Sequence, residues 1–455
     1  MKYSRKEFDA IVVGSGPGSA TVARELSLNG KKVLILEWGD NDPVKGNFSQ
    51  TISRGLIPGK GMLVTGQALG MVRGITTGGS SLLYCATAFD PPTAMLKSYG
   101  IDITTEIDEV RKDIPNDTLS DELMSPAGER FMESALDLGY NCKKLNKFIY
   151  QNKCKPDCQR CLYGCPYGAK WNARNFVNEA LENGATIMNH AKVDKVIIEH
   201  KKAIGVEYKF GKDYFSAFAP KIIIGAGGIG SPNILRKSGI HGVGYDFFFD
   251  PLIYVLGKIK DVKSGRGLSM CSGIHFPEDG IVMTDFNLPH LMKIMFDLEV
   301  FKFVQSFSYS NVVPIMIKVR DSLGGRVIND RLIWKRLIES DKHKLNKGAE
   351  HAKKILENAG ATDVYRSWYL AAHPGGTVKI GEHVNSDLET RFANLYVCDC
   401  SVMPEEWGLP PTMTILCLGK RLAKHLLGVK QIADEKRATS AAVKNMPPGE
   451  ERVPY

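Results

Sequence analysis

The sequence lacks long hydrophobic runs and has almost no apolar stretch ahead of its first glycines. None of its 455 residues belongs to an apolar segment approaching the length of about 18 residues that a membrane-spanning helix needs. Only the run from Ala10 to Val13 is apolar before Gly14, which is too short for the core of a signal peptide. We therefore expect a cytoplasmic protein without a transmembrane segment.

The chain also lacks a strong excess of charge of one sign. It carries 59 Lys and Arg residues against 50 Asp and Glu residues, a formal net charge of +9. This excess is typical of a solvated basic surface and does not indicate a nucleic-acid partner. The alternative interpretation is a surface that docks an acidic redox partner or makes peripheral contact with anionic lipid headgroups. The length and the apolar content of 43% predict a globular protein of two or three domains.

Four of the ten cysteines fall within one short segment. Cys154, Cys158, Cys161 and Cys165 are spaced C-x3-C-x2-C-x3-C and are followed by Pro166. This spacing differs from the bacterial ferredoxin run C-x2-C-x2-C-x3-C-P by one residue in the first interval. A zinc site, disulfides and ordinary buried thiols are the alternatives, but zinc sites usually hold two cysteine pairs further apart and disulfides need an oxidising compartment. The segment therefore predicts an iron–sulfur cluster, [4Fe-4S] rather than [3Fe-4S] because four thiolates are available.

The first forty residues predict a dinucleotide-binding unit. A short buried strand over residues 11–13, a glycine-rich turn, a helix over residues 20–28 and a second strand over residues 33–36 follow one another. In such a unit the glycines let the backbone approach a pyrophosphate at the helix N-terminus, and an acid after the second strand binds the adenosine ribose. Ser19 stands where the third glycine of G-x-G-x-x-G is expected. The residues predicted to contact the dinucleotide here are Gly14, Gly16, Gly18, Ser19 and Glu37.

Several later segments combine glycines with buried strands or polar residues. Residues 74–81 read GITTGGSS, and residues 222–232 run from an isoleucine-rich strand into the turn GAGGIGSP, after which we expect a helix from about Asn233. Residues 394–399 read NLYVCD, another strand that ends at an acid. Residues 373–377 read HPGGT and residues 411–415 read PTMTI.

Together these motifs resemble those of the glucose-methanol-choline (GMC) oxidoreductases, a family of FAD-dependent alcohol oxidases and dehydrogenases. The similar segments cover most of residues 8–90, 165–245 and 370–428. The resemblance implies that FAD is the cofactor and that a helix beginning near Thr412 points its N-terminus at the flavin. It also implies that Gly78, Gly79 and Ser80 line the flavin and that Asp399 binds the ribityl chain, and it adds Ser81, Ala226 and Thr412 to the residues that bind the cofactor.

His373 matches the residue that takes the hydroxyl proton while a hydride passes from the carbinol carbon to the flavin. Its imidazole suits this role because its pKa lies near working pH. Family members usually supply a second His or an Asn just before the closing helix, where this chain has Pro410. Either a nearby group such as Glu405 or Glu406 replaces it, or one acid–base residue is sufficient. Tyr84 stands where the family's first signature has Asn or His.

The fold class implied is α/β, with a GMC-type FAD-binding Rossmann-like domain, a second α+β substrate (cap) domain and a Cys-rich cluster-binding insertion. Charged helices are expected over residues 104–112, 127–139 and 341–359, and a strand over residues 311–319. The expected divisions are a discontinuous FAD-binding domain (1–90, 166–250 and 370–430), a helical insertion ending in the cysteine segment (91–165), a cap (251–369) and a C-terminal tail (431–455).

Cysteines just before a G-x-K stretch resemble those of some dehydrogenase branches of the family. By that resemblance the protein takes hydride from a CH–OH group to flavin and passes electrons singly through the cluster to a ferredoxin-like or cytochrome-like protein. The alternatives are an electron-transfer subunit that binds no small alcohol, and a reductase acting on a C=C or C=O group. Aromatic residues in the cap are expected to pack in the core, with an apolar substrate site as the alternative; they are Phe247, Phe248, Phe249, Phe301, Phe303, Phe307 and Tyr309.

Overall fold

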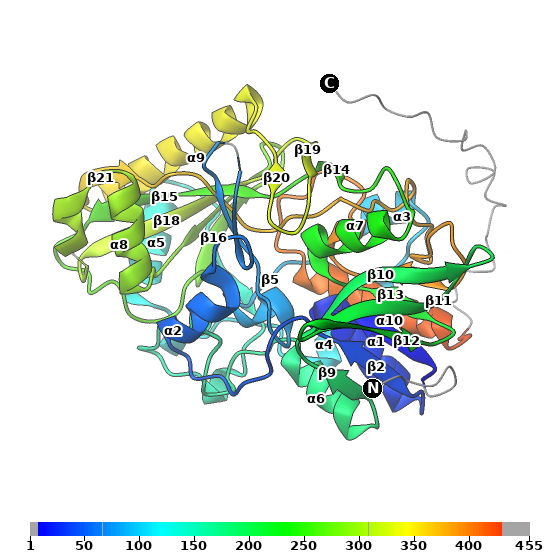
Figure 1. The fold of residues 1–455 in the computed structure, drawn as a ribbon. Helices are drawn as coiled ribbons and strands as arrows, with labels where there is room; N and C mark the ends of the chain where they lie inside the picture. The colour runs from blue at the N-terminus through cyan, green and yellow to red at the C-terminus, as the bar shows by residue number, and fades with distance from the viewer. Residues whose placement is uncertain (1–7, 66, 308, 430–455) are drawn as a thin grey trace.

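Two neighbouring lobes, each built around its own β-sheet, make up the molecule (Figure 1). The computed structural model describes residues 8–65, 67–307 and 309–429, so the predicted tail at 431–455 lies outside the described residues. Helices and sheets alternate through both lobes, and the expected α/β class is confirmed. No helix in the described part of the chain combines the length and apolarity needed to cross a membrane.

The first lobe contains a five-stranded sheet in which every neighbouring pair is parallel. The apolar runs predicted as strands form its centre, since strands covered on both faces must be apolar along their whole length. Helix α1 (Pro17–Leu28) packs between α6 (Arg174–Glu182) and α10 (Thr412–Leu426) on this sheet. In order across the sheet the strands are β23 (Leu395–Val397), β13 (Ile222–Ile224), β1 (Ala10–Val13), β2 (Val33–Leu36) and β9 (Thr186–Met188).

An antiparallel meander and helix α7 (Gly227–Lys237) complete this lobe. The meander consists of β10 (Ala191–Glu199), β11 (Lys202–Phe210) and β12 (Asp213–Phe218). Helix α7 begins at Gly227, six residues before the expected start, and so contains Pro232. The proline cannot donate to the carbonyl of Gly228, but the Thr377 hydroxyl donates to that carbonyl at 2.8 Å instead. A side chain distant in sequence therefore allows the helix to begin at the glycine turn.

The second lobe is built on a nine-stranded mixed sheet, with helices α5 (Pro126–Asp137) and α9 (Glu339–Asn358) packed against it. Strands β3, β4, β22 and β7 of this sheet come from chain segments outside residues 251–369. The order is β3 (Met62–Val64), β4 (Gly70–Val72), β22 (Leu370–Ala371), β15 (Pro251–Lys258), β18 (Val312–Val319), β17 (Ile281–Asp285), β16 (Ser272–Phe276) and β7 (Lys143–Lys144), with β21 (Thr362–Arg366) also pairing with β15.

The expected helices and strand in and before this lobe are confirmed with small changes at their ends. They are α4 (Thr104–Asp113), α5, α9 and β18. Of the cap aromatics, the side chains of residues 247–249 are fully buried in the core, as expected. Phe301 and Phe303, after helix α8 (His290–Glu299), are instead 79% and 55% exposed. The Tyr309 hydroxyl lies 2.6 Å from Gln159 Oε1, in the segment that carries the four clustered cysteines, and 2.9 and 3.0 Å from the cap carbonyls of Gly265 and Leu288. The side chain of residue 307 lies outside the described ones.

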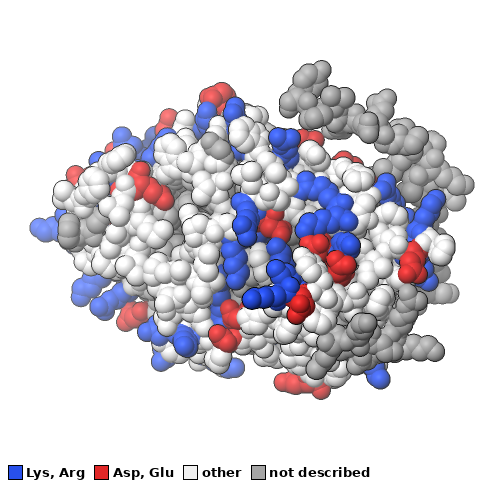
Figure 2. All heavy atoms as spheres, viewed as in Figure 1, with Lys and Arg blue, Asp and Glu red and all other residues white. Residues whose placement is uncertain are grey.

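Charges of both signs share the face on which the two lobes meet. Figure 2 shows Lys and Arg side chains gathered near the middle of this face, with Asp and Glu side chains among them. Ion pairs such as Lys192 with Asp330 and Lys237 with Asp194 neutralise part of the positive charge. This mixture agrees with a solvated basic surface.

Candidate active site

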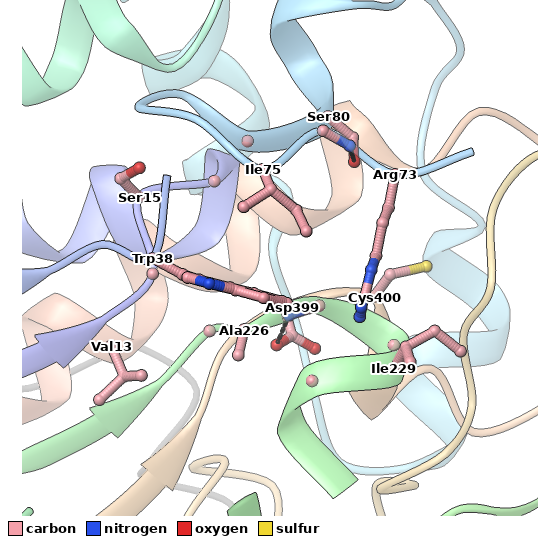
Figure 3. Close-up of a pocket in the computed structure, with 18 of the residues that line it drawn as sticks. Val13, Ser15, Trp38, Arg73, Ile75, Ser80, Ala226, Ile229, Asp399 and Cys400 are labelled. Carbon is pink, nitrogen blue, oxygen red and sulfur yellow. Dashed lines mark hydrogen bonds between the residues drawn. The ribbon is translucent and has the colours of Figure 1, made fainter. Parts of the chain in front are cut away.

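A cavity of ≈ 240 Å³ lies where four strands of the parallel sheet end. Gly14 follows β1, Glu37 follows β2, Gly225 follows β13 and Asp399 comes just after β23, and all four line the cavity. Figure 3 shows part of this lining, with Asp399 labelled beside Ala226. Ligands of open α/β sheets bind at this carboxyl edge. The predicted cofactor residues that line the cavity are Gly14, Gly16, Gly18, Glu37, Gly79, Ser80, Ser81, Ala226, Asp399 and Thr412.

The glycine-rich turn after β1 has the backbone geometry of a phosphate-binding turn. Gly14 has a φ of 86°, and a Cβ at this position would lie 2.5 Å from the carbonyl oxygen of Gly225. A Cβ on Gly16 would meet nothing within 4 Å, so the backbone there faces open space at the N-terminus of α1. Helix N-termini stabilise bound phosphate. Ser19 lies outside the cavity lining, and its hydroxyl donates to the Val13 carbonyl at 3.3 Å.

Glu37 is buried beside this turn and is held by two donors. The hydroxyl of Ser15 donates to its Oε2 at 2.6 Å and the backbone N–H of Gly39 to its Oε1 at 2.7 Å. Burial raises the pKa of the Glu37 carboxyl, while these two hydrogen bonds oppose the shift. Each oxygen keeps acceptor capacity, as recognition of ribose hydroxyls requires.

Residues 74–84, here called the glycine loop, form the next wall of the cavity. The Ser80 hydroxyl accepts from Gly74 N at 3.0 Å, and the Ser81 hydroxyl donates to Gly78 O at 2.6 Å. Gly78 lies just outside the lining, where its N–H donates to the Ser15 hydroxyl at 3.1 Å. The same serine therefore connects Glu37 with the glycine loop. Tyr84 also lines the cavity, while its hydroxyl donates away from it to the Trp171 carbonyl at 2.9 Å.

Asp399 anchors the junction between β23, α7 and the cavity. Its carboxylate accepts from Gly227 N at 2.8 Å, from Ser401 N at 2.7 Å and from the Ser231 hydroxyl. Burial raises the pKa of Asp399 in opposition to these hydrogen bonds. Nearby, the N-terminus of α10 at Thr412 opens onto the cavity without a side-chain cap, which leaves its first N–H groups available to a ligand. These walls fit FAD, with open backbone at the phosphate turn and acceptors for its hydroxyl groups.

Trp38 and Arg73 are cavity residues that the sequence patterns did not single out. Figure 3 shows the Arg73 side chain extending from the glycine-loop side toward Ile229 and Cys400. Its Nη2 donates to the Asp330 carbonyl at 2.7 Å, its guanidinium lies 5.6 Å from the centre of the Trp38 ring, and burial lowers its pKa to about 10. The position of Arg73 directly before the glycine loop was the one signal available in the sequence.

His373 lines the cavity, and its nearest polar partners differ from those expected. Its Nδ1 lies 3.0 Å from Asp250 Oδ2 and 3.5 Å from Lys318 Nζ. Glu405 is exposed and accepts from the Tyr99 hydroxyl at 3.0 Å, and Glu406 makes no hydrogen bond to the imidazole, so the suggestion that one of them partners His373 is wrong. Burial, and secondarily the charge of Lys318, lower the pKa of His373, with Asp250 opposing the shift.

The four clustered cysteines lie in residues 154–165, here called the cysteine loop, which packs against the glycine loop. All four are free and partly buried. Burial, followed by the charges of Cys165 and Cys158, raises the pKa of Cys154 to about 11. In the described ranges no three His, Cys, Asp or Glu side chains converge closely enough to hold a metal ion, so the expected cluster cage is not formed in this structure.

Lys170 connects the cysteine loop with the cavity wall. Its ammonium group is buried and donates to the carbonyls of Cys161, Leu82 and Tyr84 at 2.6, 2.7 and 3.0 Å. Two of these acceptors belong to the glycine loop and one to the cysteine loop. The two loops are therefore packed together around one buried charge.

Family comparison agrees with the geometry. Residues 8–251 match the N-terminal domain of the GMC oxidoreductases, and residues 327–419 match their C-terminal domain. The chain belongs to the GMC oxidoreductase family. It is thus an FAD-dependent oxidoreductase, in keeping with a cavity whose walls fit FAD.

This GMC oxidoreductase is similar in sequence to several curated proteins. It is 26% identical to an uncharacterized protein of Methanocaldococcus jannaschii, with 92% of this chain and 100% of the relative covered. It is 24% identical to a long-chain-alcohol oxidase of Arabidopsis thaliana, with 93% of this chain and 68% of the relative covered.

Solved structures of oxidases share the fold. Pyridoxine 4-oxidase from Mesorbium loti superposes with a TM-score of 0.74 at 16% identity, covering 93% of this chain and 100% of that chain. A formate oxidase variant from Aspergillus oryzae superposes with a TM-score of 0.71 at 15% identity, covering 92% of this chain and 98% of that chain. At these identities the likeness concerns the fold alone.

Proposed function

We propose that this GMC oxidoreductase is a dehydrogenase that takes hydride from a CH–OH group. We further propose that its cysteine loop holds an iron–sulfur cluster through which electrons leave singly to a protein acceptor. The observation that carries the proposal is the cavity position of His373, whose Nε2 has no hydrogen-bond partner among the described residues. The relative named a long-chain-alcohol oxidase supports an alcohol as the substrate class.

The chain supplies the groups for the proton side of this reaction. FAD, when bound, supplies the ring that accepts the hydride. Because burial and Lys318 lower the pKa of His373, its imidazole is neutral near pH 7 and can accept the hydroxyl proton. The N-terminus of α10 at Thr412 places the positive end of a helix dipole at the cavity, where it stabilises developing negative charge.

The cysteine loop supports the electron-transfer half of the proposal. It carries four thiols in one segment, and Lys170 fastens this segment to the glycine loop that lines the cavity. A buried ammonium whose hydrogen-bond partners are all carbonyls favours an anionic group nearby, as metal-bound thiolates would provide. Docking of an acidic redox partner or of anionic lipid headgroups, the division into FAD-binding, insertion and cap segments, and a cytoplasmic location remain predictions.

Anaerobic purification with counts of flavin, iron and sulfide tests the proposed cluster and the proposed dehydrogenase activity separately. We expect one FAD per chain, bound iron and sulfide, and reduction of the flavin by a member of an alcohol panel with an artificial acceptor. Cys158→Ser should lower the iron content, whereas Cys417→Ser, a buried cysteine outside the loop, should not. A plain flavin spectrum without bound iron would contradict the proposed cluster but not the proposed dehydrogenase activity.

His373→Ala tests the catalytic half against an electron-transfer subunit. Alcohol-driven bleaching of the flavin should fall by about 100-fold or more, because general-base catalysis contributes about that factor. Reduction by dithionite should not change. If no alcohol bleaches the wild-type flavin while protein donors do, the chain is an electron-transfer subunit instead.

A further inference from the structure

Two buried charged side chains contact the imidazole of His373 at Nδ1, on the side away from the cavity. Nδ1 of His373 lies 3.0 Å from Oδ2 of Asp250, and Nζ of Lys318 lies 3.2 Å from the same oxygen. The side chains of Asp250 and Lys318 are 0% and 2% exposed, and neither lines the cavity. They contact the imidazole and are shielded from any substrate.

Asp250 is fixed by backbone groups from separate segments. Its Oδ1 accepts from Gly408 N at 2.9 Å, in the stretch that precedes α10. Its own N–H donates to Asp321 at 2.9 Å, and Asp321 pairs with buried Lys335 at 2.8 Å. Asp250 also has a φ of 48°, a left-handed conformation that non-glycine residues adopt only when the surroundings impose it. The carboxylate therefore has one defined position.

Lys318 is the single charged residue of β18. The strand is buried along its whole length, and Lys318 lies opposite Leu252 and Val282 in the sheet. A buried ammonium is stable only when a carboxylate or other acceptors compensate it, and Asp250 is its salt-bridge partner. No packing requirement of an apolar strand explains a lysine at this position.

We propose that Asp250 and Lys318 are positioning residues for His373. Asp250 accepts the Nδ1–H of the imidazole, which leaves the lone pair on Nε2 facing the cavity. Lys318 balances the carboxylate, so the imidazole stays neutral until it takes the substrate proton. This inference rests on the proposed function of His373 as the base.

The charges around His373 fix the direction of the pH effects. Lys318 lowers the pKa of His373 and Asp250 raises it. Asp321 and Lys335 form a second pair behind Asp250, and Cys400 lies near Lys318 on the cavity side. Removing the Lys318 charge should move the acid limb of kcat/KM to higher pH. Removing the Asp250 charge should move it to lower pH.

Variants of the FAD-loaded enzyme test this pair. Lys318→Met and Asp250→Asn should shift the acid limb in opposite directions by about one pH unit, and Asp250→Asn should lower kcat by about 100-fold with little change in KM. The double variant removes both buried charges, so its thermal stability should lie near that of the wild type while kcat stays low. Lys293→Met, which breaks the buried Lys293–Asp297 pair in the cap, is the control and should leave the pH profile unchanged.

The tautomer of His373 gives a readout independent of turnover. The 15N spectrum of histidine-labelled holoenzyme, with the signal assigned by its loss in His373→Gln, should show Nδ1 protonated and Nε2 unprotonated at pH 7.5. The opposite tautomer, or shifts of the acid limb in the same direction for both variants, would overturn the inference. If no alcohol is oxidised but the Nδ1–H tautomer is present, the proposed function fails while the positioning role stands.

Discussion

The ammonium group of Lys170 donates to the carbonyl oxygen of Cys161 at 2.6 Å. The same ammonium donates to two carbonyls of the glycine loop, so it connects the cysteine loop with the wall of the cofactor cavity. A single buried side chain therefore couples the region that we propose for one-electron transfer to the region that binds FAD.

Replacing Lys170 with Met should loosen both loops. The change removes three hydrogen bonds and leaves buried carbonyls without a donor, which should lower the free energy of unfolding by about 3 kcal/mol. Iron content should fall as well if the cysteine loop holds a cluster. Chemical denaturation and iron analysis measure the two effects. Lys153→Met, an exposed lysine one residue before the cysteine loop, should change neither quantity.

A Gly14→Ala substitution should reduce FAD binding strongly. The added Cβ would lie 2.5 Å from the Gly225 carbonyl oxygen, and the φ of 86° disfavours any side chain. The purified variant should contain less than about a tenth of the wild-type flavin, as measured by absorbance after gel filtration. Gly30→Ala is a matched control, because Gly30 has a φ of 73° but its Cβ would meet nothing within 4 Å. If both variants lose flavin equally, backbone strain rather than the clash with Gly225 explains the loss.

Arg73→Gln should lower the affinity of the protein for FAD. Arg73 is a half-buried cation in the cavity wall whose hydrogen bonds go to carbonyl oxygens, so an anionic ligand gains from its charge. We expect the dissociation constant for FAD to rise by about 10-fold, corresponding to about 1.4 kcal/mol. Arg391→Gln, which removes an arginine that donates to Gly239 O outside the cavity, should leave the constant unchanged. Fluorescence titration of the apoprotein with FAD measures both.

Asp285 should make the protein less stable as the pH rises. It is fully buried, its Oδ2 has no hydrogen-bond partner among the residues that the structure describes, and burial raises its pKa to about 6 from an ordinary value of 3.8. Because the folded-state pKa lies above the unfolded one, stability falls between about pH 4 and pH 6, by about 3 kcal/mol. Asp285→Asn should remove this slope. Urea denaturation at pH 4.5 and pH 7.5 measures it, and identical slopes in the two proteins would contradict the prediction.

The sequence predicted the elements that are determined by local residue patterns. The strands before Gly14 and Glu37, and the glycine turn between them, occupy continuous segments whose apolar runs and glycines have one structural explanation. The partners of His373 could not be found in this way, since Asp250 and Lys318 reach it only through sheet pairing between β15 and β18. Glu405 is closer in sequence but points to the surface. A lone lysine in an apolar strand was the available signal.

Cysteine spacing likewise could not show whether the four thiols converge. Spacing limits how far apart they lie along the chain, whereas their distances in space depend on Lys170 and on the turn at Gly164, which has a φ of 99°. The start of α7 was missed for a similar reason, because the Thr377 hydroxyl that satisfies the Gly228 carbonyl belongs to a distant segment.

The order of strands in the parallel sheet also affects how the protein is made. β1 and β2 leave the ribosome first, β9 and β13 much later, and β23, which pairs with β13, comes after residue 394. Until then β13 is an open sheet edge, exposed to pairing with other nascent chains. FAD can be enclosed only once α10 has been synthesised, by which point β23 has already covered the open edge of β13.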